Sequence, residues 1–112
     1  MSAADAAAQP LDTTLRAIAD GNRRAILQVV RDRPLAVGEI ADQVSLSQQT
    51  TSHHLRVLKG AGLVTERRDG TRHLFVVRTD GFEVVRQFLE GFWPDRLAAL
   101  KTAAEKAARD HG

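Results

Sequence analysis

The chain contains no cysteine among its 112 residues. This absence excludes disulfides, thiolate metal sites and cysteine nucleophiles. Aromatic residues are scarce as well, at 4% of the chain. The basic segment described below contains only one of them, Phe75, whereas RNA-binding surfaces usually display several aromatic side chains for base stacking. RNA is therefore disfavoured as a partner, although it stays open as an alternative.

Long apolar runs are absent too. No stretch approaches the roughly 20 consecutive apolar residues of a membrane span, and the start of the chain, MSAADAAAQP, lacks the basic and apolar regions of a signal peptide. We therefore expect a cytoplasmic protein with no membrane partner. Residues 1–10 are small and polar and end in proline, which predicts a disordered, frayed tail, and residues 11–112 are expected to form one domain.

Basic charge is concentrated in the middle of the chain, although the net charge is only +2. Residues 47–78 hold six arginine or lysine residues and two acidic residues, a balance of +4. A basic segment in an otherwise balanced domain is typical of proteins that bind polyanions, and a merely solvated charged surface is the alternative.

The residues before and inside this segment have helical spacing. Apolar residues recur at helical intervals in LDTTLRAIAD, in NRRAILQVVRD, where Asn22 is the expected N-cap, and in VGEIADQV. A three-residue joint, residues 45–47, leads to a further helix expected from Ser47, a good N-cap, to about Lys59. Two short helices joined by so tight a turn predict a helix-turn-helix.

Further along the chain, the apolar period changes from helical to two. LVTERR and TRHLFVV flank Asp69-Gly70, a pair suited to a type I′ turn, which predicts a β-hairpin with basic residues near its tip. The last third returns to helix, with Asp80 as the expected N-cap, Glu83 three residues on, and Pro94 placed to kink or restart the helix. The predicted fold is mainly α-helical with a small hairpin, a winged helix-turn-helix of about five helices.

Three segments of the chain carry a family resemblance. They are LRAIADGNRRAIL, FWPDRLAALK and the long run LAVGEIADQVSLSQQTTSHHLRVLKGAGLVTERRDGTRHLF. They resemble the ArsR/SmtB family of bacterial transcriptional repressors over roughly residues 11–101, most closely in SHHLRVLKGAGLV and the RRDG that follows. The resemblance implies a homodimeric repressor that binds a pseudo-palindromic operator and is released by a signal, such as a small-molecule effector.

The two adjacent histidines of TTSHHLRVL are separated by helical geometry. One stripe of this helix is expected to be buried: Thr51, Leu55 and Leu58. His53 lies on the opposite face, and His54 lies at the edge of the core, where we expect a structural role. Neighbouring helix residues diverge by about 100°, so the two histidines cannot hold one metal ion and Ser52 with His53 cannot form a nucleophile–base pair. No enzymatic activity is expected.

The exposed face of this helix and the hairpin supply the candidate DNA contacts. Glutamine, serine and histidine can bond base edges, while arginine and lysine suit phosphates. We expect base readout by Gln48, Gln49, Ser52 and His53, positions at which the resemblance also implies groove contacts. We expect contacts to the DNA backbone, or from the wing, by Ser47, Arg56, Lys59, Arg68 and Arg72. A solvated polar face and a charged edge strand are the respective alternatives.

The last third of the chain holds nearly all the aromatic side chains, more apolar surface than a small core covers readily. In the resembled family, the first and last helices pair across a two-fold axis, which implies a homodimer with two recognition helices about one DNA turn apart. Its expected interface contains Leu11, Leu15, Ile18, Phe88, Phe92, Trp93, Leu97 and Leu100. Packing within the chain alone is the alternative.

Metal sensing is not expected. Zinc and nickel sensors of the resembled family use paired Asp-x-His and His-x-x-Glu or His-x-x-His groups on the last helix, whereas Asp80-Gly81-Phe82 supplies no histidine and His111 stands alone near the C-terminus. We expect no metal and no cofactor. The sequence thus predicts a sequence-specific DNA-binding repressor, with a winged-helix module for protein association or RNA binding as the alternative.

Overall fold

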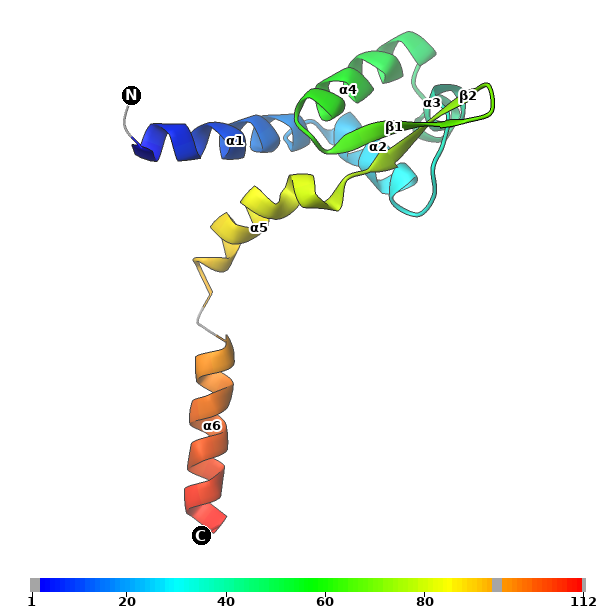
Figure 1. Ribbon diagram of the computed structural model, residues 1–112. Coiled ribbons are helices and arrows are strands. Elements are labelled where there is room, and N and C mark those ends of the chain that lie inside the picture. The colour runs from blue at the N-terminus through cyan, green and yellow to red at the C-terminus, as the bar shows by residue number, and fades with distance from the viewer. Residues whose placement is uncertain (1–2, 94–95, 112) are drawn as a thin grey trace.

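The computed structural model describes residues 3–93 and 96–111 and has the predicted winged helix-turn-helix architecture (Figure 1). The elements are α1 (Ala3–Ile18), α2 (Gly21–Arg31), α3 (Val37–Val44), α4 (Gln48–Gly60), β1 (Val64–Asp69), β2 (Arg72–Val77), the 3-10 turn η1 (Thr79–Phe82), α5 (Glu83–Glu90) and α6 (Arg96–His111). The described part of the chain therefore has six α-helices, one more than the sequence predicted. None of these helices is long and apolar enough to cross a membrane.

The helix-turn-helix is formed by α3 and α4, and local capping explains its tight turn. Ser45 ends α3 in the left-handed conformation, with φ of 59°, and the Leu46 N–H donates to the Ala41 carbonyl at 3.0 Å. The Ser47 hydroxyl then accepts the Thr50 N–H at 3.1 Å, which confirms Ser47 as the N-cap of α4. Stop and start signals two residues apart fix the direction in which α4 leaves α3.

The core lies between α2, α3, α4 and the base of the hairpin. Its fully buried apolar side chains include Ile26, Leu35, Ile40, Leu55, Leu58, Leu63 and Val64. Leu35, in the loop before α3, exchanges two backbone hydrogen bonds with Phe75 of β2, at 2.8 and 3.3 Å. The wing is thus joined to the helix-turn-helix on the side of the α2–α3 loop as well as through the chain between α4 and β1.

The hairpin is confirmed, but its turn lies one residue later than expected. β1 and β2 pair antiparallel with Asp69 opposite Arg72, so the loop residues are Gly70 and Thr71. Gly70 has φ of 63°, and Thr71 is not among the positive-φ residues. Positive φ at the first loop residue alone is the pattern of a type II′ turn and not of the predicted type I′ turn.

Two helix starts differ from the sequence prediction. α1 begins at Ala3 and includes Pro10, whereas the sequence predicted a frayed tail over residues 1–10. The N-cap of α2 is Asp20 and not Asn22, because the Asp20 Oδ1 accepts the N–H groups of Asn22 at 2.8 Å and Arg23 at 3.1 Å. These two bonds lower the pKa of Asp20, that from Arg23 contributing most.

The start of α5 also differs, because Asp80 lies in η1 and does not cap a helix; α5 begins at Glu83. At this point η1 lies close to the loop between α4 and β1. A Cβ atom at Gly81 would collide with the backbone carbonyl of Gly62 in that loop. Helix α5 ends at Glu90 and α6 begins at Arg96, while Pro94, the expected break, lies outside the described residues.

Candidate nucleic-acid interface

Helix α4 presents the polar face that the helical wheel predicts. Its buried side chains are Thr51, His54, Leu55 and Leu58. Gln48, Gln49 and His53 are exposed and Ser52 is half-buried, so all four predicted base-reading residues lie outside the buried stripe. Ser47 is exposed too, but its hydroxyl is engaged by the cap and donates to the Thr50 Oγ1 at 2.9 Å.

His54 lies at the edge of the core, as predicted. Its Nδ1 is 3.3 Å from the Arg23 Nη1. Because a guanidinium only donates hydrogen bonds, Nδ1 is the acceptor and a neutral ring carries its proton on Nε2. The His53 and His54 rings are 5.8 Å apart and tilted by 55°. One histidine thus faces outward and the other faces α2.

Arg23 of α2 has a structural role. Its side chain is only 16% exposed, and it donates to the Ala17 carbonyl from Nε at 2.6 Å and to the Arg16 carbonyl from Nη2 at 3.1 Å. These are carbonyls at the C-terminal end of α1, which a cation stabilises. Arg23 therefore joins the end of α1 to α4 through His54.

The two wing arginines predicted to touch DNA point to opposite faces of the hairpin. Cross-strand partners share a face and successive residues alternate, so Arg68 lies with its partner His73 on one face, and Arg72 lies with Asp69 on the other. Arg72 forms an ion pair with Glu39 of α3. The N–H of Ala36 and then Arg72 hold the pKa of Glu39 below its ordinary value.

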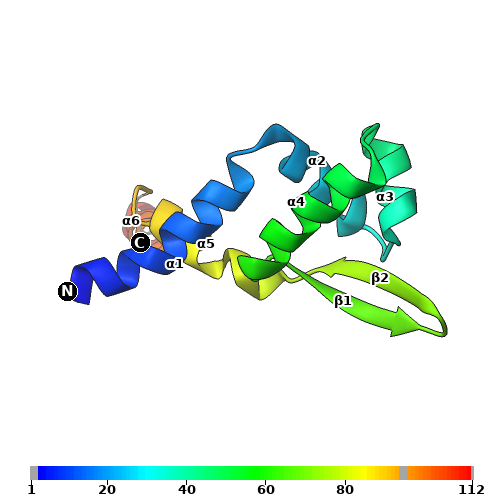
Figure 2. The same ribbon diagram turned by 90° about the horizontal axis from the view of Figure 1, so that it is seen from above.

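A cleft separates α4 from the hairpin face that carries Arg68. It has a volume of about 320 Å³ and is lined by Ser52, Leu55, Arg56, Lys59, Glu66 and Phe75. In Figure 2, α4 and the hairpin diverge from their junction. Glu66 Oε1 lies 3.1 Å from the Lys59 Nζ, and Oε2 lies 3.6 Å from the His73 Nδ1.

Glu66 was not among the residues singled out in the sequence. The available signal was an acidic residue directly before the two arginines of a basic strand. Its contact with Lys59 could not be foreseen, because it depends on the angle between α4 and the hairpin.

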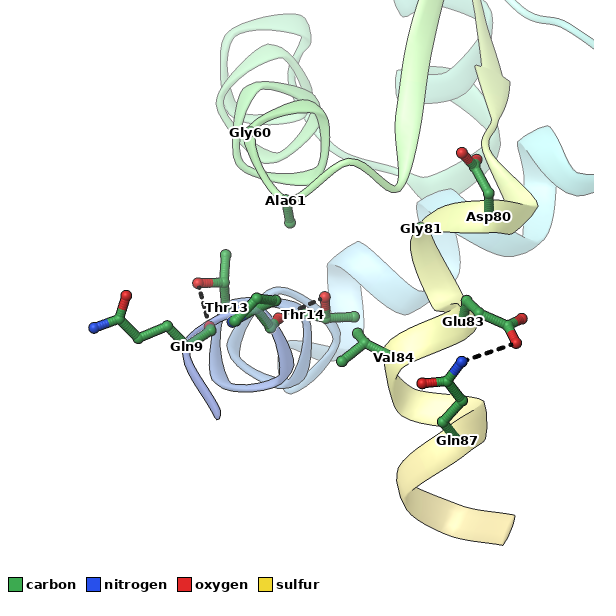
Figure 3. A pocket seen from close by; sticks show the side chains of 11 residues that line it. Gln9, Thr13, Thr14, Gly60, Ala61, Asp80, Gly81, Glu83, Val84 and Gln87 are labelled. Atoms are coloured by element: carbon green, nitrogen blue, oxygen red, sulfur yellow. Dashed lines mark hydrogen bonds between the residues drawn. The ribbon is translucent and has the colours of Figure 1, made fainter. Parts of the chain in front are cut away.

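A larger hollow of about 690 Å³ lies between α1, the end of α4 and the start of α5 (Figure 3). The Thr13 and Thr14 hydroxyls donate to the Gln9 and Pro10 carbonyls within α1, each at 3.0 Å. On the opposite wall, Glu83 accepts a hydrogen bond from Gln87. Most of the polar side chains shown in this hollow are thus bonded within their own helices.

Several predicted dimer residues are exposed in the single chain. Phe92 is 72% and Trp93 57% exposed, and Phe88 packs edge-on against Phe92 with ring centroids 5.1 Å apart. Leu15 and Leu100 are exposed as well. Leu11 is half-buried, and Ile18 is half-buried against the core of its own chain. The side chain of Leu97 lies outside the described residues.

Known proteins resemble this chain in sequence and in architecture. A family model described as a helix-turn-helix domain matches residues 18–67. The HTH-type transcriptional regulator Rv2034 of Mycobacterium tuberculosis is 43% identical over 99 residues, which cover 88% of this chain and 92% of that protein. A solved homodimeric winged helix-turn-helix DNA-binding domain from Mycobacterium bovis, described as a possible ArsR-family transcriptional regulator, is 27% identical with a TM-score of 0.68 and covers 95% of this chain and 88% of that one. The chain belongs to the ArsR family.

Another relative is an arsenical resistance operon repressor of Staphylococcus xylosus. It is 29% identical over 80 residues, covering 71% of this chain and 77% of that repressor. In this ArsR-family chain, residues 3–93 and 96–111 include no group of three or more histidine, aspartate or glutamate side chains placed to hold a metal ion.

Proposed function

We propose that this ArsR-family protein is a transcriptional repressor that binds a pseudo-palindromic operator in double-stranded DNA as a homodimer. One observation carries the proposal: α4 buries one stripe completely and presents a polar face beside a basic hairpin. A helix of this kind fits the major groove, and the hairpin then lies along the DNA backbone or the adjacent minor groove.

Base readout is assigned to the exposed face of α4. Gln48 and Gln49 can each bond the N6 and N7 positions of adenine, and Ser52 and His53 can donate to or accept from base edges. Arg56 and Lys59, nearer the helix C-terminus, and Arg68 and Arg72, on the wing, are assigned to phosphates. In this proposal the exposed face of α4 reads the base sequence, and the arginine and lysine side chains attach the protein to the DNA backbone.

Dimerisation is assigned to the exposed apolar residues of α1, α5, the segment that follows α5, and α6. An apolar cluster as exposed as Phe92 and Trp93 is typical of an interaction surface. The solved relative from Mycobacterium bovis is described as homodimeric, which supports a second copy of this chain as the partner. A two-fold axis would give one recognition helix to each half-site.

Cytoplasmic location and release by a small-molecule effector complete the proposal. The hollow of Figure 3 is the first place to test for effector binding, because its walls join α1 and α5 to the end of the recognition helix. A molecule bound there would contact both the dimerisation helices and α4.

Fluorescence anisotropy on the protein's own promoter DNA tests this function. We expect the promoter duplex to bind more tightly than a scrambled duplex of equal length, with affinity falling steeply as salt rises because phosphate contacts release counterions. Equal binding to both duplexes would show that the protein binds polyanions without sequence specificity. Binding to neither would favour the alternative, a winged-helix module for protein association or RNA binding.

A further inference from the structure

A single acidic side chain stands between the cations of the α4–hairpin cleft. Arg56 and Lys59 line the cleft from α4, and Arg68 and His73 lie on the hairpin face that carries Glu66. Each carboxylate oxygen of Glu66 is directed at one of these groups, Oε1 at Lys59 and Oε2 at His73. Lys59, one of the groups that suit a polyanion, is therefore already paired with an internal anion.

We propose that this cleft receives a phosphate of the DNA backbone and that Glu66 competes with that phosphate for Lys59. The inference rests on the proposed function. With α4 in the major groove and the wing at the minor groove, the sugar–phosphate strand that separates the two grooves must pass between α4 and the hairpin. That is the position of the 320 Å³ cleft.

Binding then requires an exchange of partners at Lys59. Its ammonium group leaves the Glu66 carboxylate, 3.1 Å away, and takes a phosphate oxygen instead. The carboxylate stays behind beside the incoming phosphate, and two like charges about 4 Å apart in a water-like medium lower a binding constant about fivefold. Glu66 thus weakens DNA binding although it lies in the middle of the DNA-binding surface.

This competition acts on every duplex, because it involves phosphate and not base edges. Backbone electrostatics supply essentially all of the affinity for nonspecific DNA. An anion in the phosphate cleft therefore lowers background binding, and the base contacts of the Gln48–His53 face then contribute a larger share of the affinity for the operator.

The substitution Glu66→Gln tests the competition, since it keeps the shape of the side chain and removes its charge. We expect about three- to tenfold tighter binding to both promoter and scrambled duplex at low salt, and a salt slope steeper by up to about one unit as Lys59 gains full access to phosphate. Glu90→Gln on α5 is the matched control: it changes the net charge equally but removes an acid that pairs with Arg86, outside the cleft.

A double-mutant cycle with Lys59→Gln identifies the competing pair. The loss of affinity caused by Lys59→Gln should be larger in the Glu66→Gln background than in the wild-type background, because Lys59 is no longer held by the carboxylate. Both Lys59 and Glu66 are at least one-third exposed, so their ion pair adds little to stability. If Glu66→Gln nevertheless lowers the unfolding temperature, Glu66→Thr, which suits a strand, takes its place.

The outcomes separate this inference from the proposed function. A well-folded Glu66→Gln variant that binds DNA as tightly as the wild type, or more weakly, would overturn the role of Glu66. If the wild type still preferred promoter DNA, the proposed repressor function would be unaffected. Failure of both proteins to bind any duplex would overturn both. If Glu66→Gln and Glu90→Gln raised the affinity for DNA equally, the effect would come from net charge, which would also contradict competition in the cleft.

Discussion

At the scale of single residues, the adjacent histidines of α4 show how far helical geometry carries a prediction. The rotation between neighbouring helix residues placed His53 outside and His54 at the edge of the core, and the structure confirms both positions. The opposite facing of Arg68 and Arg72 follows from strand alternation together with a two-residue hairpin loop, and could have been read from the sequence. The pairing of Arg72 with Glu39 could not, because it depends on where the hairpin lies against α3.

Substitution of His53 tests the base-reading face. His53→Ala removes an exposed side chain from a helix whose opposite stripe is buried, so folding should be unchanged. The preference for operator over scrambled DNA should change by about 1 to 3 kcal/mol. Competition anisotropy with both duplexes measures this difference. Arg56→Ala is the control on the same helix: it should weaken both duplexes alike and lower the salt slope by about one. Equal losses on both duplexes for His53→Ala would show that the reading face is misplaced.

At the scale of elements, the order of helices and strands was predictable and several of their ends were not. Periodicity indicated the helix-turn-helix and the hairpin because each buries one face. The predicted start of α5 was wrong. Asp80 and Glu83 have the spacing of a capping box, yet Asp80 lies in η1, which packs closely against the loop between α4 and β1. Local propensity is a weak guide where two segments come this close.

Gly81 of η1 lies close to the Gly62 carbonyl, so we expect a larger side chain there to be unfavourable. Gly81→Ala should destabilise the fold by about 1 to 3 kcal/mol, because the added Cβ would overlap the Gly62 carbonyl and push η1 away from the loop between α4 and β1. Gly60→Ala is the matched control, since its Cβ position near the end of α4 has no atom within 4 Å apart from its chain neighbours and the backbone of its own helix. Urea unfolding followed by circular dichroism measures both. Equal effects of the two substitutions would contradict the close packing of η1.

At the scale of the whole molecule, α6 extends away from the other helices (Figure 1), and the apolar residues between it and α5 are exposed. Composition indicated an excess of apolar surface in this part of the chain. It could not show which residues serve the core, and Ile18 proves to pack within its own chain. A second copy would cover the remainder.

Phe92 provides the test of dimerisation. It is 72% exposed in the single chain, so Phe92→Glu should leave the monomer folded while placing a charge in the proposed interface, and the dimer should dissociate at micromolar concentration. Sedimentation equilibrium gives the mass, and Gln28→Glu on the exposed face of α2 controls for the added charge. A wild-type protein that sediments as a monomer, or a Phe92→Glu variant that stays dimeric, would contradict this interface.

We propose that two copies of this chain read one DNA site through their α4 helices. Hydroxyl-radical footprinting of the protein on its own promoter region tests it most directly. We predict two symmetrically related protected segments whose centres lie one helical turn, about 10 base pairs, apart. A single protected segment without symmetry, or protection that spreads evenly along the DNA, would contradict the account.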